Sequence, residues 1–239
     1  MGKSLRETDM RGERIVKEYL IKHFYNLIRS KKILEKITDY CSIESIEQQF
    51  QGVDTVLYLN NGKTLNIDEK CALKYINTNL STFAFEIQWF RYGEKTVGWF
   101  INQKLQTQYY FLMWVKGKPI IEPKSGIQLK KYDYIQHMTV DDLTAVELFV
   151  VNKHLLLEYL CKIGLPSEKL LKQANWMIDN NIEQSIVTPE IKYFYSGYLA
   201  EKPVNLVISK KLLKRLADAV FYITPNQVKR NDVIIYEAS

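Results

Sequence analysis

Glycine, proline and cysteine are all scarce in this sequence. The sequence has ten glycines and six prolines among its 239 residues, which are too few to form a long flexible linker. The three cysteines, Cys41, Cys71 and Cys161, are widely spaced and form no Cys-x-x-Cys pair. An odd, dispersed set of this kind argues against a disulfide scaffold and against structural zinc.

Several common sequence signals are also missing. No apolar run approaches the length of about 18 residues that a membrane span requires, and the first residues contain no apolar segment of a secretory signal. The patterns GxxxxGK[ST], GxGxxG, HExxH and GxSxG do not occur. We therefore expect a soluble, cytoplasmic protein with no membrane partner.

The charge balance points to an anionic partner. Hydrophobic residues make up 46% of the chain and charged residues 25%, as in an ordinary globular protein. The net charge of +6 and the pI of about 9.0 favour an anionic partner, either nucleic acid or a membrane surface. One basic segment is a candidate DNA-contacting face, with a solvated helix surface as the alternative interpretation: Lys210, Lys211, Lys214 and Arg215.

The pattern of apolar residues in the first half predicts an α/β fold with the element order αβββαβ. Asn60-Asn61-Gly62-Lys63 lies between two β-rich runs, and Asn-Gly at such a place is a strong hairpin signal. The expected elements are a helix from about Thr8 to Arg29, strands over Phe50–Leu59, Thr64–Leu73 and Thr82–Phe90, a short helix over Gly93–Gln103 and a strand over Gln108–Val115.

The second half is predicted to be mainly helical. We expect residues 1–139 to form the core and residues 140–239 to form an α-helical and β-hairpin extension, with packing on the same core as the alternative to a separate domain. The remaining expected elements are a short helix or loop over 31–42, loop and edge strand over Lys118–His137, helices over Asp141–Ile163 and Ser167–Asn180, a two-stranded element over Tyr193–Ser209 and an amphipathic helix over Ser209–Val220.

Strand alternation brings together side chains that suit metal chemistry. Asp68 and Lys70 are two residues apart, so they share one face of their strand about 7 Å apart, whereas Glu69 faces the other way. The Asn-Gly turn folds the strand that carries Asp54 back beside them. Glu13 lies at the edge of the apolar stripe of the first helix and approaches from that side.

This set of residues fits phosphodiester hydrolysis. Carboxylate oxygens are the ligands that Mg²⁺ prefers, and the ion keeps several waters and bridges to substrate phosphate. Mg²⁺, or Mn²⁺ in its place, lowers the pKa of a bound water. A neighbouring lysine orients or deprotonates that water, or neutralises the phosphate. We therefore predict Asp54, Asp68 and Glu13 as metal ligands, with Lys70 as their catalytic partner.

At these residues the sequence resembles a known family. Gly52-Val53-Asp54, followed after 13 residues by Asp68-Glu69-Lys70 on a strand, is similar to the motif of the PD-(D/E)xK nucleases. Val53 stands where the motif has proline. The position of Glu13, within Arg11-Gly12-Glu13, is similar to the helix glutamate of Holliday-junction resolvases.

The resemblance covers about residues 8–115 and implies a fold and an activity. The implied fold is the restriction-endonuclease-like αβββαβ core with a mixed central sheet, to which the C-terminal region is added. The implied activity is Mg²⁺-dependent cleavage of DNA. Many nucleases of this fold dimerise to cut both strands, so a homodimer is implied as well.

Each residue also has a simpler interpretation. Asp54 could cap a strand, Asp68 and Lys70 could form an ion pair on an exposed edge, and Glu13 could favour the helix dipole. Glu86 and Gln88 alternate on the third strand, where they either extend the site as accessory residues or form a solvent-facing row.

Three functions compete on the sequence alone. The leading hypothesis is a metal-dependent deoxyribonuclease. The second is a protein of the same fold that binds nucleic acid without cutting it, and the third is a scaffold whose basic patches meet an acidic protein.

Overall fold

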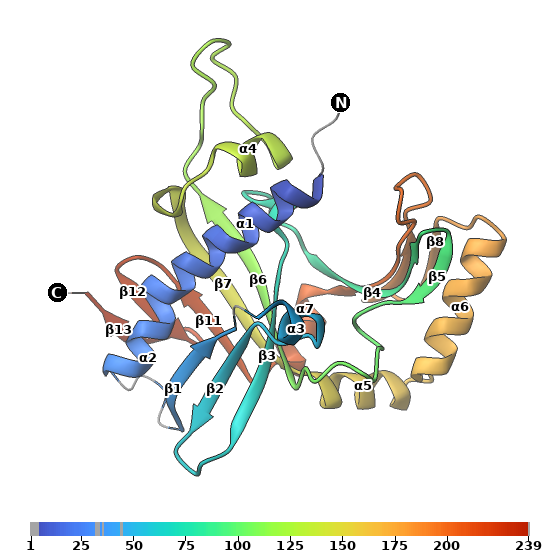
Figure 1. The fold of residues 1–239 in the computed structure, drawn as a ribbon, viewed down its shortest axis with the longest axis horizontal. Coiled ribbons are helices and arrows are strands. Elements are labelled where there is room, and N and C mark those ends of the chain that lie inside the picture. The colour runs from blue at the N-terminus through green and yellow to red at the C-terminus, as the bar shows by residue number, and fades with distance from the viewer. Residues whose placement is uncertain (1–4, 32–33, 35, 44, 239) are drawn as a thin grey trace.

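The computed structural model describes residues 5–31, 34, 36–43 and 45–238. The fold is mixed α/β, as predicted, and contains a large mixed sheet and a smaller second sheet (Figure 1). The large sheet has the order β1-β2-β3-β6-β7-β11-β12-β13, with β1 (Ile37–Ser42), β2 (Thr55–Leu59), β3 (Thr64–Cys71), β6 (Tyr109–Gly117), β7 (Leu143–Asn152), β11 (Ala219–Ile223), β12 (Gln227–Arg230) and β13 (Val233–Glu237). The second sheet has the order β5-β4-β10-β9-β8, with β4 (Thr82–Arg91), β5 (Glu94–Val97), β8 (Gln184–Thr188), β9 (Ile191–Tyr195) and β10 (Val204–Ser209).

The long N-terminal helix crosses one face of the large sheet (Figure 1). Its side chains Val16, Tyr19 and Leu20 are almost completely buried, as the apolar stripe predicts. The helical segments are α1 (Leu5–Leu20), the π-helical turn η1 (Ile21–Tyr25), α2 (Asn26–Lys31), α3 (Ile46–Phe50), the 3-10 turn η2 (Leu73–Tyr75), α4 (Lys131–His137), the 3-10 turn η3 (Val140–Asp142), α5 (Lys153–Lys162), α6 (Ser167–Asp179) and α7 (Lys210–Leu216).

The predicted hairpin is confirmed. β2 and β3 pair antiparallel, with Val56 opposite Asn66. β6 then pairs parallel to β3, with Asp68 beside Tyr110. This combination of antiparallel and parallel pairs makes the sheet mixed, and Lys17 of α1 reaches Thr55 and Glu69 at the open end of the hairpin.

Other predictions for the first half are wrong. Residues 37–42 form strand β1 rather than a helix or loop; residues 32, 33 and 35 of that segment lie outside the described residues. The short helix expected over Gly93–Gln103 is instead β5, because Tyr92 and Gly93 both adopt positive φ angles and turn the chain tightly back on β4. The third strand, β4, belongs to the second sheet rather than the central one.

The prediction of a mainly helical C-terminal region is also wrong, since that region contains more strand than helix. The expected helix Asp141–Ile163 is in fact β7 followed by α5. β7 lies between β6 and β11, and burial on both faces produces a continuous apolar run that mimics a buried helix. The helix begins only at Asn152, whose side chain caps it by accepting from the Leu155 N–H.

The remaining C-terminal predictions agree in part. β9 and β10 form the two-stranded element expected over Tyr193–Ser209, and α6 closely matches the helix expected over Ser167–Asn180. The helix expected over Ser209–Val220 ends at Leu216, because Ala219 and Val220 join β11. Within Lys118–His137, part of the expected loop is helix α4.

Two apolar cores cover the two faces of the large sheet. One lies between the sheet and α1 and includes Phe24 and Phe111. The other lies between the large sheet, the second sheet and helices α5 to α7, and includes Phe85 and Phe149. Strands from both halves of the chain pair in both sheets, as β6 does with β7 and β4 with β10. In the part of the chain that the structure describes, no helix is both long and apolar enough to span a membrane.

Candidate functional site

The carboxylates of Asp54 and Asp68 lie together at the hairpin. Asp54 directly precedes β2, and its Oδ2 accepts a hydrogen bond from the backbone N–H of Glu69 at 2.8 Å. Burial raises the pKa of Asp54 to about 6; the Lys70 ammonium opposes this shift, and the Asp68 carboxyl adds to it through its charge and a hydrogen bond. The hairpin therefore brings the first acidic position to the second.

Asp68 is the most deeply buried member of the set, with 1% of its surface exposed. Its Oδ1 accepts from the Lys70 ammonium. Among the described residues, no hydrogen-bond donor reaches its Oδ2, although that atom is buried. An unpaired buried carboxylate oxygen is costly, which makes this oxygen a candidate ligand for a cation.

Lys70 keeps its charge at this position. Its side chain is 30% exposed, and its Nζ lies 5.3 Å from the centre of the Trp99 ring. Burial disfavours the ammonium, but the carboxylates of Asp68, Asp54 and Glu13 outweigh that effect and raise the pKa of Lys70. The lysine is therefore a fixed positive charge beside two acids.

Glu13 approaches Asp54 and Lys70 from α1, whereas Asp68 is not among the residues that line their shared cleft. A cleft of about 740 Å³ is lined by Glu13, Asp54 and Lys70. Burial raises the pKa of Glu13, the Lys70 ammonium lowers it, and Asp54 raises it, so the three groups share one electrostatic environment. Gly12 precedes Glu13 and lets α1 lie close to Ile135, because an added Cβ would stand 2.8 Å from the Ile135 side chain.

A polar network lies on the α1 side of β3, and its members Glu69 and Lys17 line the same cleft as Glu13 and Asp54. Glu69 Oε1 accepts from Lys17 at 2.9 Å, from Tyr25 at 2.6 Å and from Thr55 at 2.7 Å. Lys17 also donates to the backbone carbonyl of Asp54 at 2.9 Å. Because the Glu69 N–H donates to Asp54, this network fixes the backbone that positions the first carboxylate.

The two accessory candidates, Glu86 and Gln88, lie in different surroundings in the structure. Glu86 is near enough to Lys70 for the ammonium to lower its pKa, although burial dominates and raises the pKa to about 7. Gln88 lies instead against α6, where its Nε2 donates to Asn175 at 3.2 Å. A bulge where β4 pairs with β10 breaks the alternation between residues 86 and 88, so they do not share a face.

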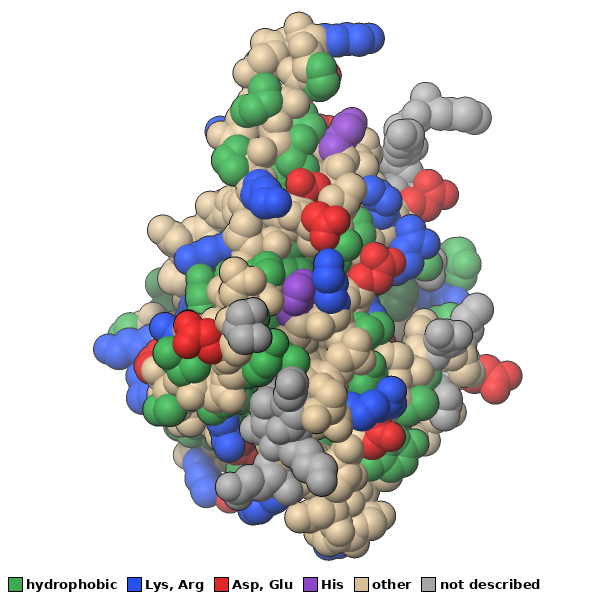
Figure 2. Space-filling view, turned by 90° about the vertical axis from the view of Figure 1, so that its left-hand side faces the viewer, with side chains coloured by type: hydrophobic (Ala, Val, Ile, Leu, Met, Phe, Trp, Pro, Cys, Tyr) green, Lys and Arg blue, Asp and Glu red, His purple; other side chains and the backbone are tan. Residues whose placement is uncertain are grey.

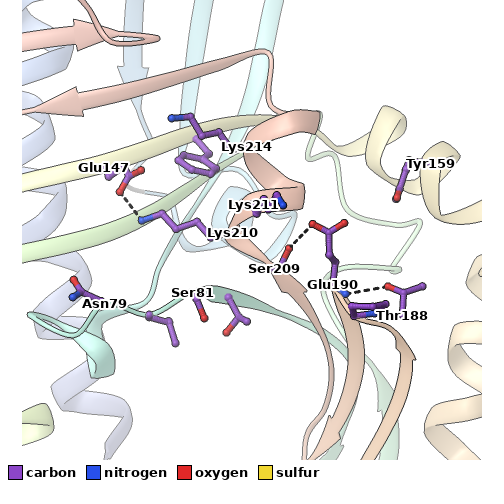
Figure 3. A pocket seen from close by; sticks show the side chains of 14 residues that line it. Asn79, Ser81, Glu147, Tyr159, Thr188, Glu190, Ser209, Lys210, Lys211 and Lys214 are labelled. Atoms are coloured by element: carbon purple, nitrogen blue, oxygen red, sulfur yellow. Dashed lines mark hydrogen bonds and ion pairs between the residues drawn. The ribbon is translucent and has the colours of Figure 1, made fainter.

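Three of the four basic residues of α7, Lys210, Lys211 and Lys214, line a second cavity of about 1060 Å³ (Figure 3). Lys210 bonds to Glu147 at 2.5 Å, and Arg215 makes a bidentate pair with Glu190 at 2.6 and 2.9 Å. These pairs satisfy acidic neighbours on β7 and beside β9, which reduces the charge available to nucleic acid. A DNA-contacting role for Lys210, Lys211, Lys214 and Arg215 stays a prediction.

Several neighbours of the site were not predicted. Tyr110 lies beside Asp68, and Trp99 lies beside Lys70. Burial lowers the pKa of Lys153, and the charge of Asp68 partly opposes this shift. Lys153 was missed because its segment was read as the middle of a long helix. Strand alternation already placed Glu69 on the far face, but its partner Lys17 becomes visible only when α1 is packed on the sheet.

The carboxylate set fits a hard divalent cation in part. Across the described ranges, no group of three or more His, Cys, Asp or Glu side chains is arranged to hold a metal ion. Mg²⁺, however, commonly takes only one or two carboxylates and completes its shell with water and phosphate. Asp54 and the unpaired Oδ2 of Asp68 supply such a pair of oxygens.

Comparison of this chain with protein-family models, with curated proteins and with solved structures finds no match.

Proposed function

We propose that the protein is a metal-dependent nuclease of the PD-(D/E)xK type, which hydrolyses phosphodiester bonds in DNA. The observation that supports this most is the meeting of Asp54, Asp68 and Lys70 at one hairpin. Glu13 lines the cleft from α1, in the position that the resemblance implies for the helix glutamate. The restriction-endonuclease-like fold is part of the same proposal.

The proposed roles follow from charge and burial. Asp54 and Asp68 would hold Mg²⁺ or Mn²⁺, with Glu13 as a further carboxylate of the cleft. When bound, the metal would supply a water of lowered pKa and positive charge beside the scissile phosphate. Two neighbouring carboxylates repel each other, as the raised pKa of Asp54 reflects, so a divalent cation would relieve the repulsion.

Lys70 acts in this proposal as an electrostatic group. Its pKa is raised by three carboxylates, so its ammonium holds its proton and is a poor base. A protonated lysine that lines the cleft can bind a phosphate oxygen and stabilise the negative charge that develops during hydrolysis. The chain thus supplies both the cation-binding oxygens and a fixed positive charge.

One observation favours a second candidate, a nucleic-acid-binding protein of the same fold that does not cut. Lys70 already neutralises Asp68, and the described residues offer no group of three metal-ligating side chains. In that case Asp54, Asp68 and Lys70 would be a structural polar cluster. Such a protein would still bind DNA with a strong dependence on salt.

Cleavage assays separate the two candidates. Duplex, single-stranded and branched DNA are incubated with the protein in Mg²⁺, in Mn²⁺ and in EDTA. We expect cleavage of at least one substrate that requires metal and falls at least a hundredfold in Asp68→Asn and Lys70→Met. A matched control is Asp179→Asn, which removes an exposed acid that pairs with Lys95 on the second sheet. Metal-independent activity, or activity equal in the site variants, would refute the nuclease proposal.

DNA binding without cleavage identifies the second candidate. In that outcome the wild-type protein binds DNA in EDTA and in Mg²⁺ alike. Asp54→Asn and Asp68→Asn then bind as tightly as the wild type, and none of the substrates is cut.

A further inference from the structure

Residues 118–130 form a narrow β-hairpin, called here the arm, that projects beyond the rest of the molecule next to α4 (Figure 1). Its two sides are joined by backbone bonds from Leu129 N–H to the Ile120 carbonyl at 2.8 Å and from Glu122 N–H to the Ile127 carbonyl at 2.9 Å. Gly126, at φ +68, makes the turn at the tip. The two sides of the arm are therefore paired antiparallel around the bridge between Ile121 and Gln128.

The arm exposes apolar and basic side chains together. Ile121 is 53% exposed and Ile127 is 65% exposed. The arm, residues 118–130, contains three lysines and one glutamate, a net charge of +2. Figure 2 shows hydrophobic and basic side chains side by side on the projecting segment at the top of the molecule. Single exposed isoleucines are common on protein surfaces, so the basic charge of the arm is the feature that favours an acidic partner.

The two isoleucines lie on opposite faces of the ribbon. Ile121 pairs with Gln128, so their side chains share one face. Ile127 pairs with Glu122 and therefore faces the other way. Both faces of the ribbon offer apolar contact, which suits a partner that encloses the ribbon from two sides, such as a groove.

The arm is fixed relative to the proposed active site. At its base, Tyr134 on α4 donates to the carbonyl of Lys118 at 2.8 Å. On the same helix, Ile135 packs against Gly12 of α1, and the Arg11 guanidinium donates to the Met138 carbonyl at 2.8 Å. Glu13 follows these residues directly and lines the cleft. A partner held by the arm would thus be held beside the cleft.

We propose that the arm docks in a groove of double-stranded nucleic acid and holds it against the cleft. This inference rests on the proposed function and names its substrate class as duplex. A two-stranded ribbon has strands about 5 Å apart, and the major groove of B-DNA is about 12 Å wide, so the ribbon fits. The lysines along the arm then face phosphates on the groove walls, and the isoleucine on the face turned to the groove floor contacts base edges such as the thymine methyl group.

The composition of the arm opposes pairing with another polypeptide. Pro119 and Pro123 lack the N–H that sheet extension requires. Lysines along its length repel a second copy of the same arm and keep sheet edges apart. Charge complementarity therefore favours nucleic acid over a strand of another chain.

The test compares Ile121→Ser/Ile127→Ser and Lys124→Ala with the wild type in EDTA, where cleavage is suspended. Affinity for a fluorescent duplex and for its single strand is measured by anisotropy at several salt concentrations. The matched control is Ile186→Ser, a 70% exposed isoleucine on β8 of the second sheet. Thermal unfolding of each variant by circular dichroism checks that the fold is retained.

We expect the double isoleucine variant to bind duplex about tenfold more weakly, with little change for the single strand. Lys124→Ala should lower the slope of log affinity against log salt by about 0.9. The control should bind as the wild type does. Unchanged duplex binding in the arm variants, or a wild type that binds no duplex, would overturn the inference.

Two further outcomes keep the proposals apart. If the wild type binds duplex through the arm but never cleaves it in Mg²⁺, the proposal for the arm is supported and the nuclease proposal is refuted. If the wild type cleaves DNA in Mg²⁺ and the arm variants bind duplex as tightly as the wild type, the nuclease proposal is supported and the proposal for the arm is refuted. A change of oligomeric state in the arm variants by sedimentation would identify a second copy as the occupant and overturn the inference.

Discussion

Replacing Asp54 by asparagine should stabilise the protein above neutral pH. Asp54 has a pKa of about 6 in the folded protein, against an ordinary value of 3.8, because burial and the Asp68 carboxyl disfavour its charge. Between these two values the folded state holds a proton that the unfolded state has released, so stability falls as pH rises from about 4 to about 6. Asparagine has no charge to disfavour, and its side-chain oxygen can still accept from the Glu69 N–H.

The size of the effect follows from the same shift. A difference of about 2 pH units corresponds to about 3 kcal/mol. Asp54 is partly open to the cleft, where solvent screens its charge, so we expect a gain of about 1–2 kcal/mol. The assay is urea unfolding of wild type and Asp54→Asn in EDTA at pH 4, 5, 6 and 7.5. The free energy of unfolding of the variant should exceed that of the wild type by an amount that grows with pH and levels off above pH 6.

Asp39 provides a matched control, because its replacement should change the free energy of unfolding in the opposite direction. The Arg29 hydrogen bond holds the pKa of Asp39 below its ordinary value. Asp39 therefore contributes stability above its unfolded pKa, so Asp39→Asn should be slightly less stable than wild type near neutral pH. An Asp54→Asn variant that is equally or less stable than wild type at pH 7.5, or a difference that does not change with pH, would refute the reasoning.

Three further predictions concern the site and the network behind it. Lys17→Met should lower the free energy of unfolding by about 2–3 kcal/mol, because it leaves the buried Glu69 carboxylate without its ion-pair partner. The double variant Lys17→Met/Glu69→Met should lose less stability than Lys17→Met alone. A double-mutant cycle by urea unfolding measures the coupling between the two residues. Mg²⁺ at ten times its dissociation constant should stabilise the wild type by about 1.4 kcal/mol and leave Asp68→Asn unchanged, which thermal unfolding with and without EDTA would show. Lys70→Met should weaken DNA binding less than it slows cleavage, because the Lys70 ammonium stabilises the negative charge that develops in the transition state. The measurement compares the Kd for DNA with the single-turnover cleavage rate, and equal changes in both would contradict the prediction.

The sequence predicted the local parts of the site well. The Asn-Gly turn and strand alternation correctly placed Asp68 and Lys70 together and Glu69 on the other face. Both signals depend only on neighbouring residues. The hairpin then brings Asp54 to Asp68, so the meeting of three of the proposed site residues needed no tertiary information.

The errors arose where tertiary contacts override local pattern. β7 is buried on both faces, so its apolar run carries no period of two and was read as helix. β4 pairs with β10, more than one hundred residues later, and this pairing moves it out of the central sheet. Gln88 then faces Asn175 instead of the site, because a bulge in that pairing shifts its side chain. No local pattern contains these long-range pairings.

The most direct test of the central claim is diffraction from crystals of the protein grown with Mn²⁺. We predict an anomalous peak between the carboxylates of Asp54 and Asp68, in contact with the oxygen Oδ2 that has no protein donor among the described residues. Lys70 should stay charged beside the ion, and the peak should vanish in Asp68→Asn. Crystals that diffract well in excess Mn²⁺ and show no peak at these two carboxylates would contradict the claim that they form a metal site.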